Sequence, residues 1–532
     1  MTNHIQKIEI TARYLRFPIG YRTDTKKIKI YRDNQLVADL DLRFDVRDVS
    51  EYVYYDVSQY RGEWLQIVLP DNIDYAMVQC DERIYRSSCE RPAIHFTAPF
   101  GWINDPNGMI AYTSSVTGET TYHMFYQHNP YDTIWGNMHW GHATSRDLLH
   151  WEHQPLALCP DAMGTMFSGC AILDRDNRSG LREGAEDVIL FYYTAAGNTS
   201  ALSEGKPFTQ CLAYSTDGGK TLRKYEGNPI LPHIQGDNRD PKVIWCDELS
   251  CYVMALYLDG NEYVLHRSED LIHWAFLQKL TFPGEAECPD FYPLNADDDP
   301  AKRKWVISGA SHRYMIGEWR EGQFHVVQGA RSLHYGPYSY ASQTLSDVSD
   351  GRRINVAWHR GIPYPEKAEC NGQMSVPIEM TLKTDGSEYR LCANPISELS
   401  GILHKFWEQS GLLLRNGNPF SLPLKSNAYE VIWDLTTIGD CVMRIQIFGN
   451  ELIVNTKANQ MCMGDNAAPL SLSDRPTKLR AIVDRYSMEL FAGDGEIMMT
   501  VPITLHDGDS CLLMDVDGDT RIAYFAMFEH QE

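Results

Sequence analysis

The chain has 532 residues, and at roughly 150 residues per average domain this length predicts three to four domains. Lys and Arg number 48 against 71 Asp and Glu, which gives a formal net charge of −23 and argues against nucleic acid as a partner. With 43% hydrophobic and 22% charged residues, the composition excludes a disordered chain. No apolar run approaches the ~20 residues of a membrane span, so no membrane partner is expected.

The cysteines argue against a disulfide framework or a zinc site. Thirteen of them are scattered from Cys80 to Cys511 without a CxxC pair. The opening residues MTNHIQK have no apolar segment behind them that resembles an export signal. We therefore expect reduced thiols and a cytoplasmic location, or secretion if a leader was removed. The number of subunits is not predicted.

The first part of the chain, residues 1–91, reads as a small β module. Short runs alternate apolar and polar residues between Ile8 and Leu69: IEITARYLRF, KKIKIYR, YVYYDVS and EWLQIVLP. Gly, Asp and Asn separate the runs. This pattern is typical of antiparallel strands.

An apolar strand recurs through the middle of the chain. It appears as YHMFYQ, VILFYYT, CYVMALY, KWVISGA and INVAWH, starting at Tyr122, Val188, Cys251, Lys304 and Ile354. The segment SRDLLHW after the first strand is echoed by SEDLIHW after the third. Five strands at blade-like intervals predict a five-bladed β-propeller over residues 92–392. An irregular β-sandwich is the alternative on periodicity alone.

Residues 393–532 return to short alternating strands after PISEL, a linker with room for a brief helix. The strands are YEVIWDL, CVMRIQIFG, LRAIVDR, SMELFAGDG and CLLMDV. They predict a C-terminal β-sandwich. The whole chain is thus expected to be all-β.

Three acidic residues stand at the entries to different predicted blades. Asp105 lies in GWINDPNG, Asp240 in RDPKV and Glu287 in AECPDF. A single Asp-Pro pair is more often a turn than a catalyst. Together, however, the three supply what hydrolysis of a glycosidic bond with retention needs: an ionised nucleophile, a protonated acid/base and a further charge for the ring hydroxyls.

These motifs resemble glycoside hydrolase family 32, the invertase, inulinase and levanase family of β-fructofuranosidases. The resemblance also rests on FYQHNP, WG, WGHATS and FSG in the family's order, and on SMELF in the C-terminal part. It covers the chain from about Pro92 to its end. YLRFPI, at residues 14–19, weakly resembles an accessory β module of some bacterial fructan hydrolases.

The resemblance implies a role for each matching residue. Asp105 would be the nucleophile, Glu287 the acid/base and Asp240 the stabiliser of the transition state. The positions expected to line the fructose subsite are Trp102, Asn104, Gln127, Trp135, Phe167, Ser168, Arg239 and Trp358. The implied substrates are sucrose, fructo-oligosaccharides, inulin or levan, with no preference predicted between β-2,1 and β-2,6 linkages or between exo and endo action.

Electrostatics leads to two further expectations. Arg239 should lower the pKa of a neighbouring carboxyl, and the charge of ionised Asp105 should help to keep Glu287 protonated. Cys170 and Ala286 depart from the family's pattern, and we expect both at the rim, where they would affect leaving-group specificity.

Alternatives at the level of function stay open. A fructosyltransferase would use the same intermediate with a sugar acceptor, and a sugar-binding propeller would lack catalysis. A second EC pair, Glu369 and Cys370, lacks the Pro-Asp-Phe continuation and is not expected to be the acid. His128, His139 and His142 are expected to form hydrogen bonds rather than a metal site. No cofactor and no metal are expected, because carboxylates suffice for fructosyl transfer.

Overall fold

The computed structural model describes residues 4–70, 75–85, 89–436, 438–470, 477–505 and 510–530. Within these ranges the regular structure consists of β-strands and the short 3-10 helices η1 (Ser58–Tyr60), η2 (Ala201–Ser203), η3 (Pro300–Lys302) and η4 (Ser397–Gly401). The prediction of an all-β chain is confirmed, and the PISEL linker leads into η4. No helix in the described ranges is long and apolar enough to cross a membrane.

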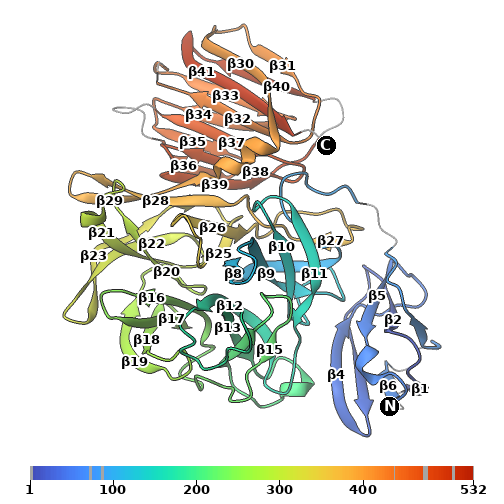
Figure 1. Cartoon of the computed structure of the whole chain (residues 1–532). Helices are drawn as coiled ribbons and strands as arrows, with labels where there is room; N and C mark the ends of the chain where they lie inside the picture. The colour runs from blue at the N-terminus through green and yellow to red at the C-terminus, as the bar shows by residue number, and fades with distance from the viewer. Residues whose placement is uncertain are drawn as a thin grey trace.

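Two sheets form the N-terminal part, drawn in blue in Figure 1. One contains, in spatial order, β1 (His4–Glu9), β6 (Trp64–Leu69), β3 (Lys26–Arg32) and β4 (Gln35–Leu42). The other contains β5 (Glu51–Asp56), β2 (Tyr14–Ile19) and β7 (Val78–Cys80). Their buried apolar residues share one core, which Phe100 and Tyr131 of the following part also enter. The module therefore packs directly on the rest of the chain.

Five sheets of four antiparallel strands each follow, and one more, parallel strand extends the first of them. The first sheet contains β8 (Gly101–Thr113), β9 (Thr120–Asn129), β10 (His139–Ser145) and β11 (Trp151–Leu158), and the second contains β12 (Thr165–Asp174), β13 (Val188–Ala196), β14 (Thr209–Ser215) and β15 (Arg223–Lys224). The third contains β16 (Arg239–Cys246), β17 (Cys251–Asp259), β18 (Glu262–Ser268) and β19 (Ala275–Thr281), and the fourth contains β20 (Asp290–Asn295), β21 (Arg303–Ser308), β22 (Arg313–Arg320) and β23 (Gln323–Ser332). The fifth contains β25 (Tyr340–Thr344), β26 (Arg353–Trp358), β28 (Ile378–Asp385) and β29 (Glu388–Pro395). The two-residue strand β27 (Cys370–Asn371) joins the first sheet, parallel to β8.

The recurring apolar strand of the sequence is the second strand of each sheet: β9, β13, β17, β21 and β26. The repeated SxDL segment is also one structure. Leu148 and Leu271 both have positive φ, and the N–H of each donates to the serine hydroxyl three residues earlier. The first strands contact one another in cyclic order, β8 to β12, β16, β20, β25 and back to β8. Residues at the starts of these strands are thereby brought around a common centre.

Two larger sheets make up the C-terminal part, at the top of Figure 1. One contains β24 (His334–Tyr335), β39 (Ile497–Pro502), β38 (Ser487–Ala492), β37 (Lys478–Val483), β32 (Tyr429–Asp434), β41 (Thr520–His530) and β30 (Leu403–Leu414). The other contains β31 (Phe420–Pro423), β40 (Cys511–Val516), β33 (Val442–Ile447), β34 (Asn450–Asn455), β35 (Gln460–Met463) and β36 (Asn466–Pro469). Apolar residues of both sheets form one core around Trp433. All five strand segments predicted here are strands.

A buried ion pair connects three of the five central sheets. Lys242 Nζ on β16 lies 3.1 Å from Asp290 Oδ1 on β20, with side-chain exposures of 3% and 0%. Thr344 on β25 donates its N–H to Asp290 Oδ2 at 2.7 Å, and its carbonyl accepts from Lys242 at 2.7 Å. The pair therefore holds neighbouring inner strands in register beside the centre.

Replacing Asp290 by Asn is expected to lower the free energy of unfolding by about 3–5 kcal/mol, because it leaves the Lys242 charge buried without a counter-ion. Denaturant unfolding measures the loss. The matched control is Asp494→Asn, which removes an exposed partner of Lys383 at 3.4 Å and is expected to cost less than about 1 kcal/mol. Equal losses in the two variants would contradict this account of the pair.

Candidate active site

Asp105 lies on β8 where the strand is irregular. The pairing with β9 shifts register between Ile103 and Pro106, since proline has no N–H for the ladder. Asp105 Oδ1 accepts a hydrogen bond from Asn104 Nδ2 at 3.0 Å, and its Oδ2 accepts one from Ser168 Oγ on β12 at 2.6 Å. Two neutral donors from neighbouring sheets thus fix the carboxylate.

Asp240 lies at the start of β16 and has a strained backbone. Its φ is +65°, a region that costs a residue other than glycine about 1–3 kcal/mol and is often found at functional sites. Its N–H donates to Thr194 Oγ1 at 3.0 Å, and its Oδ2 accepts the N–H of Cys288 at 3.0 Å. These contacts hold the residue in place against the strain.

Glu287 and Cys288 precede β20, and both have positive φ, +57° and +37°. The Cys288 thiol lies 3.6 Å from Asp105 Oδ2 and 3.5 Å from Asp240 Oδ2. Asp105 of the first sheet and Asp240 of the third therefore meet at one thiol, and Glu287 is the residue next to that cysteine. This is the convergence that the sequence predicts.

The Glu287 carboxylate has two strong partners. Arg239 Nη2 donates to Oε1 at 2.5 Å, and the Tyr340 hydroxyl donates to Oε2. Arg239 also lies over the ring of Tyr257, 4.8 Å from its centre. Arg360 lies over the ring of Tyr340, 4.2 Å from its centre. A cation and a phenol thus hold the carboxylate, and a second cation covers the phenol.

Burial and these contacts shift the pKa values of the three carboxyls in different directions. Burial raises the pKa of Asp105, and the nearby charge of Glu287 adds to this. Burial raises the pKa of Asp240 to about 7, although Arg239 acts in the opposite direction. Burial also acts to raise the pKa of Glu287, but the hydrogen bonds from Tyr340 and Arg239 outweigh it, and the pKa is lowered.

Arg239 helps to lower the pKa of the neighbouring Glu287, as expected, but the expected protonation of Glu287 needs correction. The expectation that Glu287 is held protonated is wrong for the free protein, because its donors favour the ionised form. Arg239 does favour ionisation of its neighbour Asp240, yet burial is the larger effect there and raises the pKa. In the free protein the proton is thus favoured on Asp240 rather than on Glu287.

The structure places several of the predicted binding residues beside the carboxylates. Asn104, Ser168 and Arg239 contact them directly. Trp102 donates from Nε1 to Asn104 Oδ1 at 2.8 Å, and its ring lies edge-on to that of Trp358, with centres 5.6 Å apart. Trp102, Asn104 and Asp105 therefore form one chain of hydrogen bonds.

The other predicted binding residues form an aromatic edge and a buried amide. Trp135 is 56% exposed and meets Phe167 edge-on at 6.2 Å between ring centres. Phe167 in turn meets Phe208 at 5.5 Å. Gln127 is buried on β9, and its Nε2 has no hydrogen-bond partner, so this amide group retains an unused donor.

Sequence reasoning did not single out Tyr340, Arg360 or Phe208. No local pattern marks Tyr340, and only the fold brings its hydroxyl to Glu287. Cys288 belongs to AECPDF, but the motif predicts no role for it. Cys170, expected at the rim, is instead buried, and its sulfur accepts the N–H of Val243 at 3.1 Å between the second and third sheets.

The residues that the sequence analysis did not expect to act as the acid or as metal ligands form hydrogen bonds with other groups. Glu369 accepts a hydrogen bond from Arg91 at 2.7 Å. His128 bonds to the carbonyl of Trp102 at 2.8 Å, His139 to that of Asn137, and His142 to His123 at 3.0 Å. Among the described residues, the one group of three potential metal ligands within reach of a common ion is His95, His359 and Glu489.

Comparison with known proteins identifies relatives of the central and the C-terminal parts of the chain. The family model described as "Glycosyl hydrolases family 32 N-terminal domain" matches residues 95–395, and "Glycosyl hydrolases family 32 C terminal" matches residues 404–503. The levanase of Bacillus subtilis is 32% identical over 463 residues, which cover 77% of this chain and 66% of the levanase. The invertase of Schizosaccharomyces pombe is 32% identical over 375 residues, which cover 64% of this chain and 60% of the invertase.

The chain thus spans somewhat less than two thirds of the length of these curated relatives. Among solved structures, exo-inulinase from Aspergillus awamori superposes with a TM-score of 0.72 at 24% identity, covering 83% of this chain and 98% of the inulinase. The all-β arrangement described above is therefore a known fold.

Proposed function

Because this chain belongs to glycosyl hydrolase family 32, we propose that it is a retaining β-fructofuranosidase that releases fructose from the non-reducing end of sucrose, fructo-oligosaccharides or fructans. The observation that carries the proposal is the meeting of Asp105 and Asp240 at the Cys288 thiol, next to Glu287, with Arg239 in contact with both Asp240 and Glu287. We also infer that the five central sheets are the blades of a propeller. Residues 1–91 then form an accessory module, residues 92–392 the catalytic domain and residues 393–532 a β-sandwich.

In the first step, Asp105 attacks the anomeric carbon of the fructosyl unit while Glu287 gives a proton to the departing oxygen. In the second step, Glu287 takes a proton from water, which attacks the fructosyl-enzyme. Asp240 accepts hydrogen bonds from ring hydroxyls and favours the positive charge of the transition state. Ser168 and Asn104 hold Asp105 in place for attack.

The acid role requires a proton on Glu287, which the free protein disfavours. Its ionised form depends on donors from Tyr340 and Arg239. A bound sugar displaces water from the pocket and competes for these donors. Both effects raise the pKa of Glu287. Asp240, whose pKa is about 7, gives its proton to water and then faces the sugar as an anion.

The residues around the three carboxylates recognise the sugar in this proposal. We propose that Gln127 uses its unpaired amide, and Arg239 its guanidinium, on fructose hydroxyls. Trp102 and Trp358 offer apolar faces to a sugar beside the carboxylates, and the exposed Trp135 and its neighbour Phe167 offer a further aromatic surface.

The proposal is tested by incubating the protein separately with sucrose, inulin and levan and separating the products by chromatography. Fructose should appear from the outset without larger fragments from the polymers. Oligosaccharides that grow at high sucrose concentration would instead favour a fructosyltransferase. No turnover of any of the three substrates would contradict the proposal.

Tyr340→Phe is expected to move the basic limb of the pH profile of kcat/KM to higher pH. The Tyr340 hydroxyl stabilises ionised Glu287, so its loss raises the pKa of this carboxyl. The acid then stays protonated over a wider range. Tyr338→Phe removes a hydroxyl from the same segment and should leave the limb in place. A limb that moves to lower pH in Tyr340→Phe would refute this role.

A further inference from the structure

A buried ion pair joins the N-terminal module to the central sheets. Arg43, which directly follows β4, donates from Nε to Asp132 Oδ1 at 2.9 Å and from Nη2 to Thr133 Oγ1 at 2.8 Å. The side chains of Arg43 and Asp132 are only 12% and 1% exposed. Such a pair keeps its geometry, because breaking it would leave a charge buried without a partner. Arg43 thus fixes residues 132 and 133 in the connection between β9 and β10.

A second contact fixes the same connection a few residues further along. The side chain of Asn137 accepts the N–H of Asp41 on β4 at 2.8 Å and donates to the carbonyl of Asp41 at 2.8 Å. Between these two anchors lies the exposed Trp135. The module therefore holds both ends of the short segment that presents this ring.

Strand β4 also contacts the connection that leads to Phe208. Asp39 Oδ2 accepts the N–H of Ala201, the first residue of η2, at 2.7 Å. Phe208 follows in the same connection, and its ring meets that of Phe167. Phe167 in turn meets Trp135 and is the sequence neighbour of Ser168, which bonds to the Asp105 carboxylate. One edge of the module thus contacts two loops that carry aromatic rings beside the candidate active site.

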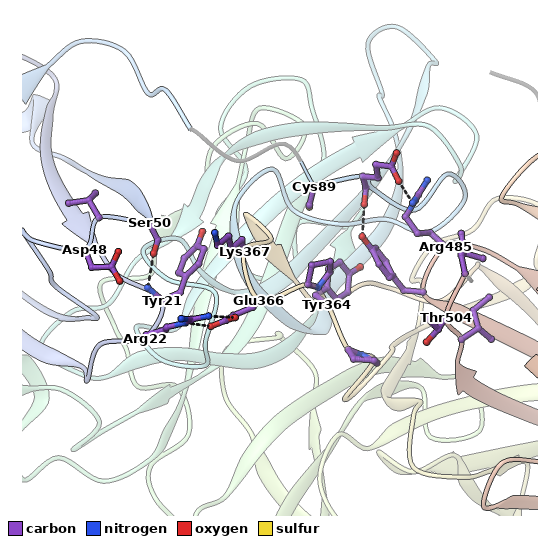
Figure 2. A pocket seen from close by; sticks show the side chains of 17 residues that line it. Tyr21, Arg22, Asp48, Ser50, Cys89, Tyr364, Glu366, Lys367, Arg485 and Thr504 are labelled. Carbon is purple, nitrogen blue, oxygen red and sulfur yellow. Dashed lines mark hydrogen bonds and ion pairs between the residues drawn. The ribbon is translucent and has the colours of Figure 1, made fainter. Parts of the chain in front are cut away.

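Elsewhere a cavity of about 990 Å³ separates the module from residues 363–367 and from the C-terminal part (Figure 2). Arg22 of the module donates there from Nε to Glu366 Oε1 at 2.6 Å and from Nη2 to Oε2 at 3.0 Å. Both of these side chains are more than half exposed. An exposed pair contributes little to stability, so Arg22 is a suitable control for the buried Arg43.

We propose that the N-terminal module positions the aromatic surface of Trp135, Phe167 and Phe208 for sugar binding, with Arg43 as the positioning residue for Trp135. This inference rests on the proposed function, because it assumes that the surface binds part of a fructoside. A ring on a loop that is free to move must be ordered when the sugar binds, and this ordering weakens binding. Loss of the anchor leaves the carboxylates in place, so KM rises while kcat is kept.

Arg43→Ala in the full-length chain is expected to raise KM for sucrose at least ~5-fold, with kcat within about twofold. A smaller folded fraction would lower the apparent kcat and leave KM unchanged, so the two constants separate positioning from stability. Hydrogen exchange of the backbone N–H groups in residues 131–138 should become at least ~10-fold faster. Asn137→Gly removes the second anchor, suits the φ of +43° at this position, and should act in the same direction.

Arg22→Ala, the matched control, should leave both KM and the exchange of residues 131–138 unchanged. Adding Arg43→Ala to Trp135→Ala should raise KM by less than about twofold beyond Trp135→Ala alone, because Arg43 acts through this ring. The inference is overturned if KM or the exchange stays unchanged in both anchor variants, or if the two changes in KM multiply. An unmodified protein that turns over no fructoside would instead refute the proposed function, and the sugar-binding part of this inference with it, whereas the exchange rates would still show whether the module holds the loop.

Discussion

Replacing Asp105 by Asn is expected to lower kcat on sucrose by about 10⁴-fold or more, in line with the removal of a catalytic nucleophile. An amide of the same shape keeps a place for the Ser168 hydroxyl but cannot form the fructosyl ester. The protein should therefore still fold. Steady-state kinetics give the loss, and the thermal midpoint checks the fold.

The matched control for Asp105→Asn is Glu369→Gln, which alters the second EC pair. Glu369 is bonded to Arg91 and contacts none of the three carboxylates in the described structure. Its kcat/KM should stay within about threefold of the unmodified protein, well under 1 kcal/mol of transition-state stabilisation. A comparable loss in both variants would show that the wrong EC pair was assigned to catalysis.

Glu287→Ala is expected to lower kcat/KM on sucrose by about 10²–10⁴-fold, the usual contribution of a general acid or base. The loss should be smaller on a nitrophenyl fructoside, because that leaving group departs without a proton. With the nitrophenyl fructoside, azide should restore part of the activity and give fructosyl azide of retained configuration, because it attacks the fructosyl-enzyme without a general base.

Azide separates the roles of the two residues. It should not restore Asp105→Asn, in which no fructosyl-enzyme forms. Equal losses of Glu287→Ala on sucrose and on the nitrophenyl fructoside would contradict the assignment of Glu287 as the acid.

Much of the fold is predictable because strands of one kind recur in the sequence. The five apolar segments are all second strands, buried on both faces, and such strands leave a continuous apolar run. The two-residue strands β24 and β27 were not predicted. Each is too short to show an alternation of apolar and polar residues. Each forms only because a distant strand, β39 for β24 and β8 for β27, supplies its pairing partner.

The candidate site also has features that the sequence predicts and features that it does not. Asp105, Asp240 and Glu287 stand in local motifs, so their convergence was predictable once a closed ring of sheets was expected. Tyr340 reaches Glu287 from the fifth sheet, and no local pattern marks this contact. The pKa values depend on burial and on such distant donors, which explains why the expected protonation of Glu287 was wrong in the free protein.

The C-terminal motif gives a second example. Glu489 belongs to SMELF, whose sequence resembles the family but predicts no contact for this residue. In the structure its two oxygens each lie 3.0 Å from a histidine nitrogen, of His95 and of His359. Burial opposes charge on His95, yet hydrogen bonds to Asp484 and Glu489 raise its pKa to about 9. A buried ionic contact between the C-terminal part and the central sheets cannot be deduced from one strand's sequence.

The central claim is double displacement through Asp105, and the configuration of the first-formed fructose tests it most directly. NMR spectra recorded during rapid hydrolysis of sucrose, before the anomers equilibrate, distinguish the two outcomes. Attack by Asp105 followed by attack by water inverts the anomeric carbon twice, so the account predicts β-fructofuranose as the first product. The α anomer as the first product would mean a single displacement by water and would contradict the mechanism.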